Sequence, residues 1–562
     1  MQAVLVGLPL LSAWHLLSLP EGTMIQVTVC GLELTLARID KLSLVWGYIF
    51  HIAAFASALF ALKVEDRGQH VAGLAYAGSA IGGVFAGDLI TLFVYWELTA
   101  LTSVFLVWAR HAYLPDAEQE AQALRSRRAG MRYLLIQVGS GVILLAGIVL
   151  RLAQGSATVG DFEAYNRLLV FDRMVLGDLP TVLIFLAFGI KAAFPFLHNW
   201  LEDAYPEATP TGTVFLSAFT TKMAIYALAR GFPGTELLIY IGAAMTAFPI
   251  FFAVIENDLR RVLAYSLNNQ LGFMVVGVGL GTELSLNGTA AHAFAHILYK
   301  ALLFMAMGAV LMRTGTTKGS ELGGLYKSMP WTTGLCIVGA ASISAFPLTS
   351  GFVSKSLILS AAAKEHHTLV WCILLFASAG VFHHSGIKIP FFAFFAHDSG
   401  KRVKEAPWNM LLAMGITAAL CLLVGMFPGA LYSILPFDVK YEPYTASHVV
   451  TQLQLLLYSA LAFTVLNRIG AYPPELRSTV LDFDWFYRRP LPALTGWAVR
   501  IGGRVWSEIL ETLDALRRGV LTAVEHLHGP EGAFARTWSI QAVVLGALIT
   551  LGAYLLLYFS VG

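Results

Sequence analysis

The chain has 562 residues, of which 57% are hydrophobic and 13% are charged. Soluble domains carry about 25% charged residues, so this composition excludes a water-soluble enzyme of the same size. The 37 Lys and Arg residues nearly balance the 35 Asp and Glu residues, giving a net charge of +2, and nothing indicates a nucleic-acid partner.

Four cysteines lie far apart and form no CxxC pair: Cys30, Cys336, Cys372 and Cys421. This spacing argues against a disulfide framework, a thiolate zinc site, a cysteine-ligated iron–sulfur cluster and c-type haem. The pairs His366-His367 and His383-His384 lack thiolate or carboxylate neighbours at zinc spacing. We therefore expect a large polytopic membrane protein with no cofactor and no metal.

A membrane-spanning helix needs about 20 predominantly apolar residues, and such runs recur along the chain. The first run has no Lys or Arg before it and no small-residue cleavage site after it, which predicts a retained helix rather than a signal peptide. The expected fold is all-α, with about fifteen transmembrane helices. The predicted spans are 2–19, 42–62, 71–87, 89–109, 131–152, 181–204, 211–230, 236–255, 262–281, 289–313, 331–364, 370–394, 409–435, 448–468 and 538–559.

Two of the predicted spans carry an Ala-Phe-Pro sequence in mid-membrane. Because proline removes a helix hydrogen bond and frees the carbonyl four residues earlier, Pro195 and Pro347 are predicted to break their helices. The freed carbonyls belong to Lys191 and Ile343, and the second break is expected to extend through Gly351. Two broken helices about 150 residues apart indicate an internal inverted repeat of the kind that transporters use.

If each broken helix counts as one span, successive loops alternate between the two sides of the membrane, and the basic loops all fall on the same side. Loops on the other side, such as 151–180 and 436–447, are acidic or mixed. The positive-inside rule then makes the basic side cytoplasmic. The loops predicted to be cytoplasmic are 110–132, 256–261, 313–330 and 395–408.

Ionisable side chains recur inside the predicted spans, where an isolated charge costs about 2.5–3.5 kcal/mol on insertion scales. Burial and nearby charges change the proton affinity of lysine and glutamate, and histidine titrates near neutrality, so a row of such groups can relay protons. The predicted relay comprises Glu97, Lys191, Lys222, His292, His296, Lys300 and Lys355. Residues of a possible relay or entrance are His198, Glu202, His383, His384 and Lys388.

Some of these groups also have an ordinary structural interpretation. Glu97 can also be interpreted as a structural hydrogen-bond partner, and His292 and His384 as packed core residues. Lys388 fits a lysine whose ammonium group reaches the interface. His198 and Glu202, near the cytoplasmic mouth, fit a solvated helix terminus nearly as well as a proton entrance.

The carboxyl-terminal part differs in pattern from the membrane region. Residues 494–528 carry an apolar stripe at a spacing of three to four, with charged residues opposite it. We interpret this segment as an interfacial, lateral helix along the cytoplasmic face, followed by a last span. The expected organisation is 1–70 (amino-terminal helices), 71–255 and 256–408 (two half-channel repeats), 409–470 (membrane helices), 471–537 (amphipathic segment) and 538–562 (last span).

Several ordered motifs resemble one protein family. Residues 87–97 (GDLITLFVYWE), 189–201 (GIKAAFPFLHNWL), 296–304 (HILYKALLF) and 351–355 (GFVSK) are similar to the antiporter-like subunits of respiratory complex I and of Mrp-type cation/proton antiporters. The resemblance covers about residues 25–470. The stretch 382–400 is more similar to the D-type subunit of Mrp antiporters than to complex I.

The resemblance implies a role for most of the relay residues. Glu97 and Lys191 would be the charge-switching pair of the first half-channel, and Lys222 the connecting lysine. His296 and Lys300 would form the central axis, and Lys355 the terminal group of the second half-channel. Family members usually carry one more helix before 42–62, so parity would place this amino terminus in the cytoplasm.

Three functions are compatible with these observations. The first is a proton-translocating subunit of a multi-subunit sodium/proton antiporter, with other antiporter subunits, membrane lipid, protons and Na⁺ as partners. The second is a pump subunit in the membrane arm of a complex I-like or hydrogenase complex. The third is the proton-conducting partner of a bicarbonate-accumulating complex. The stretch 382–400 favours the first, an ion-transporter subunit rather than an enzyme.

Overall fold

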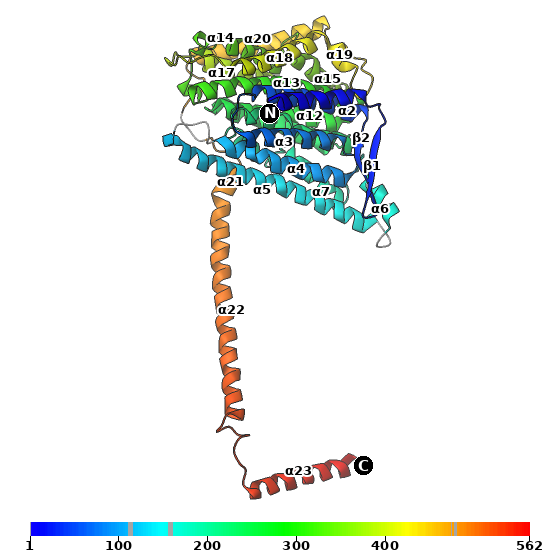
Figure 1. Cartoon of the computed structure of the whole chain (residues 1–562), viewed down its shortest axis with the longest axis vertical. Helices are drawn as coiled ribbons and strands as arrows, with labels where there is room; N and C mark the ends of the chain where they lie inside the picture. Colours follow the sequence, from blue (N-terminus) through cyan, green and yellow to red (C-terminus); the bar gives the residue numbers. More distant parts are fainter. Residues whose placement is uncertain (1, 111–115, 156–160, 474, 477–479, 562) are drawn as a thin grey trace. The chain divides into compact units, whose positions relative to one another are not determined.

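A computed structural model describes residues 2–110, 116–155, 161–473, 475–476 and 480–561 (Figure 1). The chain divides into two compact units, Met1–Asp482 and Phe483–Gly562. The first unit begins with α1 (Gln2–Ser18), β1 (Met24–Val29), β2 (Leu32–Arg38), α2 (Lys41–Phe60), α3 (Arg67–Phe85), α4 (Leu89–Trp108), α5 (Asp116–Gly155), α6 (Phe162–Leu169), α7 (Leu179–Lys191), α8 (Asn199–Ala204), α9 (Gly212–Ala218) and α10 (Thr220–Gly231).

The first unit then repeats a similar order of long and interrupted helices. Its elements are α11 (Leu237–Ile255), α12 (Leu259–Leu280), α13 (Glu283–Thr314), η2 (Gly319–Glu321), η3 (Leu325–Lys327), α14 (Pro330–Ile343), α15 (Ser350–Lys364), α16 (Thr368–Val381), the π-helical turn η4 (Phe382–Ile387), α17 (Lys388–Pro390), the π-helical turn η5 (Phe391–Phe395), α18 (Trp408–Met426), α19 (Pro428–Tyr432) and α20 (Ala446–Arg468).

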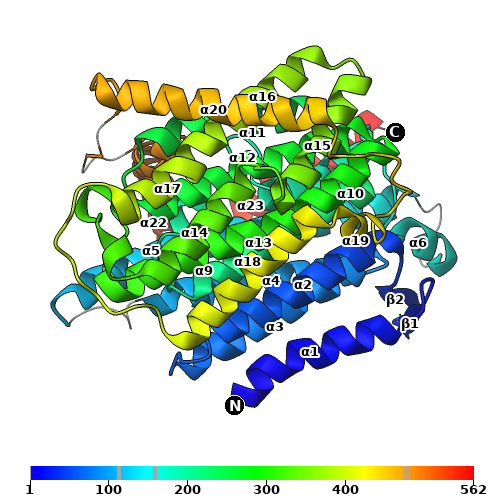
Figure 2. The ribbon, with the colours of Figure 1, turned by 90° about the horizontal axis from the view of Figure 1, so that it is seen from above.

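Each of the fifteen predicted spans falls on a helix or on a run of adjacent helices. Ten helices of the described chain are long and apolar enough to cross a membrane, and α1, α7 and α14 are shorter apolar helices. The count is below fifteen partly because interruptions split several spans into shorter helices. Figure 2 shows α13 in the middle of the first unit, with α1 and α20 at opposite edges.

The described chain is all-α as expected, apart from one short β-hairpin. Strands β1 and β2 pair antiparallel, and Cys30 and Gly31 at the turn have φ of 51° and 85°, as a tight two-residue hairpin turn requires. The amide of Gly87 donates to Thr35 O over 2.9 Å, and the amide of Thr35 donates to Asp88 Oδ2 over 2.7 Å. The hairpin therefore packs on the end of the bundle where α4 begins.

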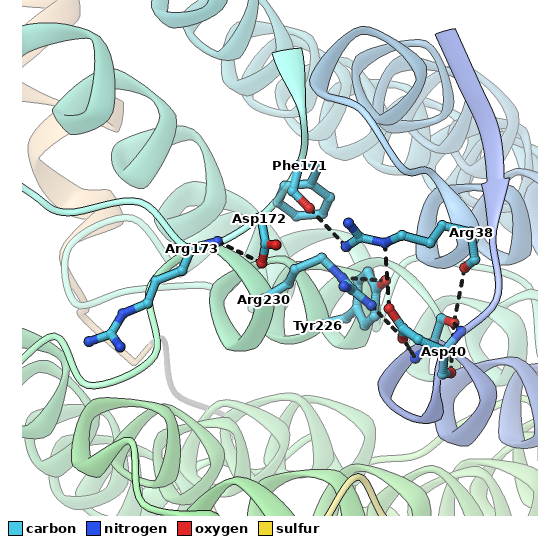
Figure 3. Close-up of polar contacts among 8 residues, drawn as sticks. Arg38, Asp40, Phe171, Asp172, Arg173, Tyr226 and Arg230 are labelled. Atoms are coloured by element: carbon cyan, nitrogen blue, oxygen red, sulfur yellow. Dashed lines mark hydrogen bonds and ion pairs between the residues drawn. The ribbon is translucent and has the colours of Figure 1, made fainter. Parts of the chain in front are cut away.

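An ion-pair network holds the same end of the bundle together (Figure 3). Asp40, which caps α2, lies 2.7 Å from Arg230 at the end of α10 and 3.4 Å from Arg38 of β2. Arg230 also donates to Tyr226 OH over 2.8 Å. Partial burial opposes ionisation of Asp40, but the hydrogen bond and charge of Arg230 outweigh it and lower the pKa of Asp40. The network joins the hairpin to the first repeat.

The basic loops predicted to be cytoplasmic lie together at the opposite end of the bundle. Arg132 forms a two-pronged hydrogen bond with Asp203, at 2.6 and 3.0 Å. Asp258 pairs with Lys318 as an isolated β-bridge, and Arg260 donates to Pro206 O over 2.9 Å. Asp398 accepts from Lys327 and Arg402 at 2.8 and 2.7 Å. These contacts agree with the predicted alternation.

The second unit contains α21 (Asp484–Arg488), α22 (Pro490–His528) and α23 (Ile540–Val561). The long α22 contains the predicted amphipathic segment 494–528 and extends it by four residues at its start. α23 is apolar along its whole length and coincides with the last predicted span.

Candidate functional site: a row of buried titratable groups

The first predicted break separates α7 from α8. α7 ends at Lys191, α8 begins at Asn199, and Ala193 and Phe196 between them have positive φ of 63° and 69°. The fully buried Lys191 ammonium donates to Trp96 O and, over 2.9 Å, to Thr99 Oγ1. Lys191 is thus held on α4, and Glu97 lies in the same turn of that helix.

Glu97 occupies a space that a glycine provides. A Cβ atom built on Gly141 of α5 would overlap Oε1 of Glu97, so a larger residue there would force the carboxyl group to move. Oε1 is buried and has no hydrogen-bond partner among the described residues. The charges of Glu97 and Lys191 influence each other, although no ion pair within 4.0 Å joins these two described residues. The charge of the carboxylate can therefore act on the lysine ammonium without a direct contact between them.

Lys222 lies at a third break that the sequence analysis missed. Phe219 separates α9 from α10 with φ of −104° and ψ of −68°. The Lys222 ammonium is fully buried and donates to Ser217 O over 2.6 Å and to Thr221 Oγ1 over 3.1 Å. No proline marks this break, so the sequence carried no clear signal for it.

The central helix α13 carries His292, His296 and Lys300, all fully buried. The rings of His292 and His296 are 6.2 Å apart between centroids. Both ring nitrogens of His296 and the Lys300 ammonium have no hydrogen-bond partner among the described residues. Buried polar groups are almost always paired, with protein or with ordered water, so these two side chains are places where water would bind.

A hydrogen-bonded chain that the sequence analysis missed crosses the second repeat. Ser354 Oγ lies 3.0 Å from His292 Nδ1, and Tyr299 OH lies 3.4 Å from His292 Nε2. Tyr299 OH donates to Gln270 Oε1 over 3.1 Å, and Gln270 donates to Asn269 Oδ1 over 2.6 Å. The sequence did contain a signal for this chain, namely the run of side-chain amides at 268–270 inside an apolar span, where polar residues are costly.

The second predicted break separates α14 from α15. Ala345 and Leu348 have positive φ of 58° and 71°. The Lys355 ammonium donates over 2.7 Å to Ile343 O, the carbonyl that Pro347 frees. Gly351 lies in the first turn of α15 rather than in the break. A Cβ there would overlap Ser342 O, so its role is close packing.

The histidine pair and Lys388 lie at the two π-helical turns. His384 is fully buried, with Nδ1 2.9 Å from Ser385 Oγ, which donates to Ser266 Oγ over 2.7 Å. His383 is half-buried and packs on Phe463, with 5.4 Å between centroids. π-helical turns are frequent at functional sites. Lys388 is ion-paired with Glu475 at 2.9 Å, a contact that the sequence analysis did not foresee.

The possible entrance lies at the start of α8. His198 Nε2 is 3.1 Å from Asp482 Oδ2, and Glu202 is buried one turn later. Among the described residues, no group of three or more His, Cys, Asp and Glu side chains could hold a metal ion. The first unit thus buries Glu97 beside Lys191, and it gathers Lys222, Lys300, Lys355 and His292 close enough to His296 for their charges to influence it.

This architecture defines a multi-pass membrane protein with two helices that are interrupted at an Ala-Phe-Pro sequence, each beside a buried lysine. Its sequence matches the profile of the NADH:quinone oxidoreductase/Mrp antiporter, TM family over residues 86–382, more than half of the chain. The chain belongs to that family.

Known relatives serve different complexes. The chain is 28% identical to hydrogenase-4 component B of Escherichia coli over 70% of this chain and 62% of that protein. It is 29% identical to the D-type subunit of the Na⁺/H⁺ antiporter of Alkalihalophilus pseudofirmus over 64% of this chain and 73% of that protein. The chain thus covers less than two thirds of the hydrogenase component.

Two solved structures share the fold. A chain of the Mrp complex from Dietzia sp. superposes with a TM-score of 0.65, at 20% identity, over 84% of this chain and 94% of that chain. A chain of the archaeal membrane-bound sulfane sulfur reductase superposes with a TM-score of 0.68, at 22% identity, over 99% of this chain and 95% of that chain. The chain therefore shares its fold with a chain of each of these two complexes.

Proposed function

We propose that the protein is the proton-translocating subunit of a multi-subunit Na⁺/H⁺ antiporter. The observation that carries this proposal is the set of buried lysines, in which Lys191, Lys222 and Lys355 each donate to a backbone carbonyl oxygen. A lysine that donates to a backbone carbonyl can lose its proton without breaking a buried ion pair. Water at His296 and Lys300 then joins the two repeats.

The relay works by changes in local charge. When Glu97 attracts Lys191, the lysine retains its proton, and when the carboxylate is neutralised the lysine releases it toward Lys222. The central histidine and lysine of α13 pass the proton on to Lys355. Each transfer is between neighbouring groups or through one bound water, because a proton moves along hydrogen bonds and does not cross a dry gap.

A second candidate function is a pump subunit of a redox complex. It is favoured by the likeness to hydrogenase-4 component B and by the superposition with the sulfur reductase chain over 99% of this chain. The relay within the subunit would be the same, and the driving reaction would take place in partner subunits.

Ion-flux measurements in inverted vesicles that contain the whole complex test both candidates. We expect Lys191→Ala, Glu97→Ala and Lys355→Ala each to lower Na⁺-dependent proton exchange by about 100-fold, the lower range for loss of a proton-transfer group, with assembly preserved. Lys364→Ala is the matched control, because Lys364 is an exposed lysine at the end of the same helix as Lys355.

The outcome separates the candidates. Full exchange in all three variants would refute the relay. Proton movement that needs an electron donor and ignores Na⁺, but is lost in the same variants, would support the redox complex instead.

A further inference from the structure

The segment that follows α20 returns to the cytoplasmic end of the first unit and brings two carboxylates with it. Glu475 contacts Lys388, with side chains 6% and 0% exposed. Asp482 contacts His198, with side chains 6% and 3% exposed. Both contacts join residues far apart in the sequence, and both are more buried than ordinary surface ion pairs. They differ in what they leave unsatisfied.

The Lys388 contact is complete on the lysine side, although neither oxygen of Glu475 makes a hydrogen bond with a described residue. Its ammonium has three N–H groups, and it donates to Val254 O over 2.6 Å and to Glu256 O over 2.7 Å, with Glu475 Oε1 at 2.9 Å. The two carbonyls lie at the carboxyl end of α11, where a positive charge is stabilised by the helix dipole. Lys388 is therefore satisfied as a fixed cation and has the properties of a structural anchor.

The His198 contact is incomplete in a way that suits proton transfer. Nε2 faces Asp482 Oδ2 at 3.1 Å, and Tyr265 OH donates to the same oxygen over 3.1 Å. The other ring nitrogen, Nδ1, is buried and has no hydrogen-bond partner in the part of the chain that the structure describes. The Asn199 amide lies 3.5 Å from Nε2, at the limit of a hydrogen bond, so the charged Asp482 decides which nitrogen carries the proton.

We propose that His198 and Asp482 form the proton-loading site on the cytoplasmic side of the first broken helix, an inference that rests on the proposed function. In the neutral ring, Nε2–H is donated to Asp482, which leaves the lone pair of Nδ1 free. A hydronium ion or water transfers one proton to Nδ1, and the resulting imidazolium is stabilised by the Asp482 carboxylate. Release of that proton from Nδ1 toward Lys191 restores the neutral ring.

Asp482 acts here as a positioning residue, and neighbouring charges set its surroundings. Glu202 and Asp203 lie on α8, Tyr265 and Arg261 lie on α12, and Arg132 of α5 is paired with Asp203. The carboxylate of Asp482 is the charge in direct contact with the ring. Its removal should therefore change the protonation of His198 more than removal of any single neighbour.

The test compares Asp482→Asn with Glu475→Gln in the whole complex, with flux expressed per assembled complex. Asp482→Asn should lower proton-coupled exchange by about tenfold, below the usual range for a proton-transfer group because the ring remains. It should also displace the pH–rate profile toward lower pH, because the imidazolium loses its counter-charge. Asp482→Glu should restore part of both. Glu475→Gln is the matched control and should leave the pH profile in place.

Three results would overturn the inference. One is an Asp482→Asn complex with wild-type flux and pH profile. Another is equal loss of assembly in both variants with an unchanged profile, which would make the segment a purely structural tie. The third result applies if the Asp482→Asn complex does not assemble. It is a pH–rate profile of the Asp482→Glu complex that equals the wild-type profile. Failure of the proposed function is distinguished by Lys191→Ala, which would then retain exchange.

Discussion

The two repeats share a scaffold but differ in the groups that line it. Asp88 and Asp258 each cap a long helix, and they lie at opposite ends of the bundle, as an inverted repeat requires. When the two helices are aligned on these caps, Glu97 falls at Leu267, beside Asn268. The first repeat thus has a carboxylate where the second has amides.

The broken helices differ in the same way. When their Ala-Phe-Pro sequences are aligned, Lys191 falls at Ile343 and Lys355 falls at Asp203. In the second repeat the lysine comes from beyond the break and donates back to Ile343 O, so its ammonium reaches the position that Lys191 holds in the first.

The largest expected effect sharpens the contrast at Glu97. Gly141→Ala introduces a methyl group where Oε1 of Glu97 lies, and we expect proton exchange to fall by about tenfold or more as the carboxylate is displaced. Gly139→Ala is the control, because a Cβ at Gly139, on the same helix, meets nothing within 4 Å. Vesicle flux per assembled complex is the measurement, and equal flux in the two variants would contradict the role given to Glu97.

A smaller effect is expected in the second repeat. Tyr299→Phe removes the hydroxyl group between His292 and Gln270, and a hydrogen-bond loss of about 1 kcal/mol would slow transfer about fivefold. Tyr441→Phe removes a hydroxyl that accepts a hydrogen bond from Ser360 over 3.2 Å, away from the buried lysines and histidines, and serves as the control. A Tyr299→Phe complex with undiminished exchange would show that protons bypass this hydroxyl.

The smallest effect on transport is expected at the network of Figure 3. The pKa of Asp40 is lowered in the folded protein, so its ion pairs stabilise the fold above the unfolded pKa of about 4. That stability is lost as the pH falls through the lower, folded-state pKa. Asp40→Asn should therefore reduce the Tm at pH 7, with a smaller reduction near pH 3, and should leave ion exchange unchanged. A Tm difference that is constant across this pH range would refute an ionic role.

The sequence predicted the parts of the site that depend on local chemistry. Proline chemistry located both breaks, and hydropathy with charge located the buried lysines and the end at which the basic loops lie. It did not reveal partners set by tertiary packing. His198 and Asp482 are 284 residues apart, the break at Phe219 has no proline, and the short alternating strands β1 and β2 were outweighed by the helical pattern around them.

The same limit explains why Lys388 and Lys300 could not be distinguished beforehand. Both are buried lysines in apolar helices. Lys388 nevertheless contacts three backbone carbonyls and one carboxylate, whereas Lys300 has no acceptor among the described residues. Composition and spacing describe the donor alone, whereas its behaviour depends on acceptors contributed by α11 and by the segment after α20.

The scarcity of carboxylates in the buried row has a further consequence. Lys222 and Lys355 each lie close enough to Lys300 for their charges to oppose a charge on it, and repulsion between like charges is strong where the dielectric constant is low. Charging all three lysines at once is therefore unfavourable. An extra positive charge arriving at one end raises the energy of every occupied neighbour, so entry and expulsion are linked by electrostatics with little movement of the backbone.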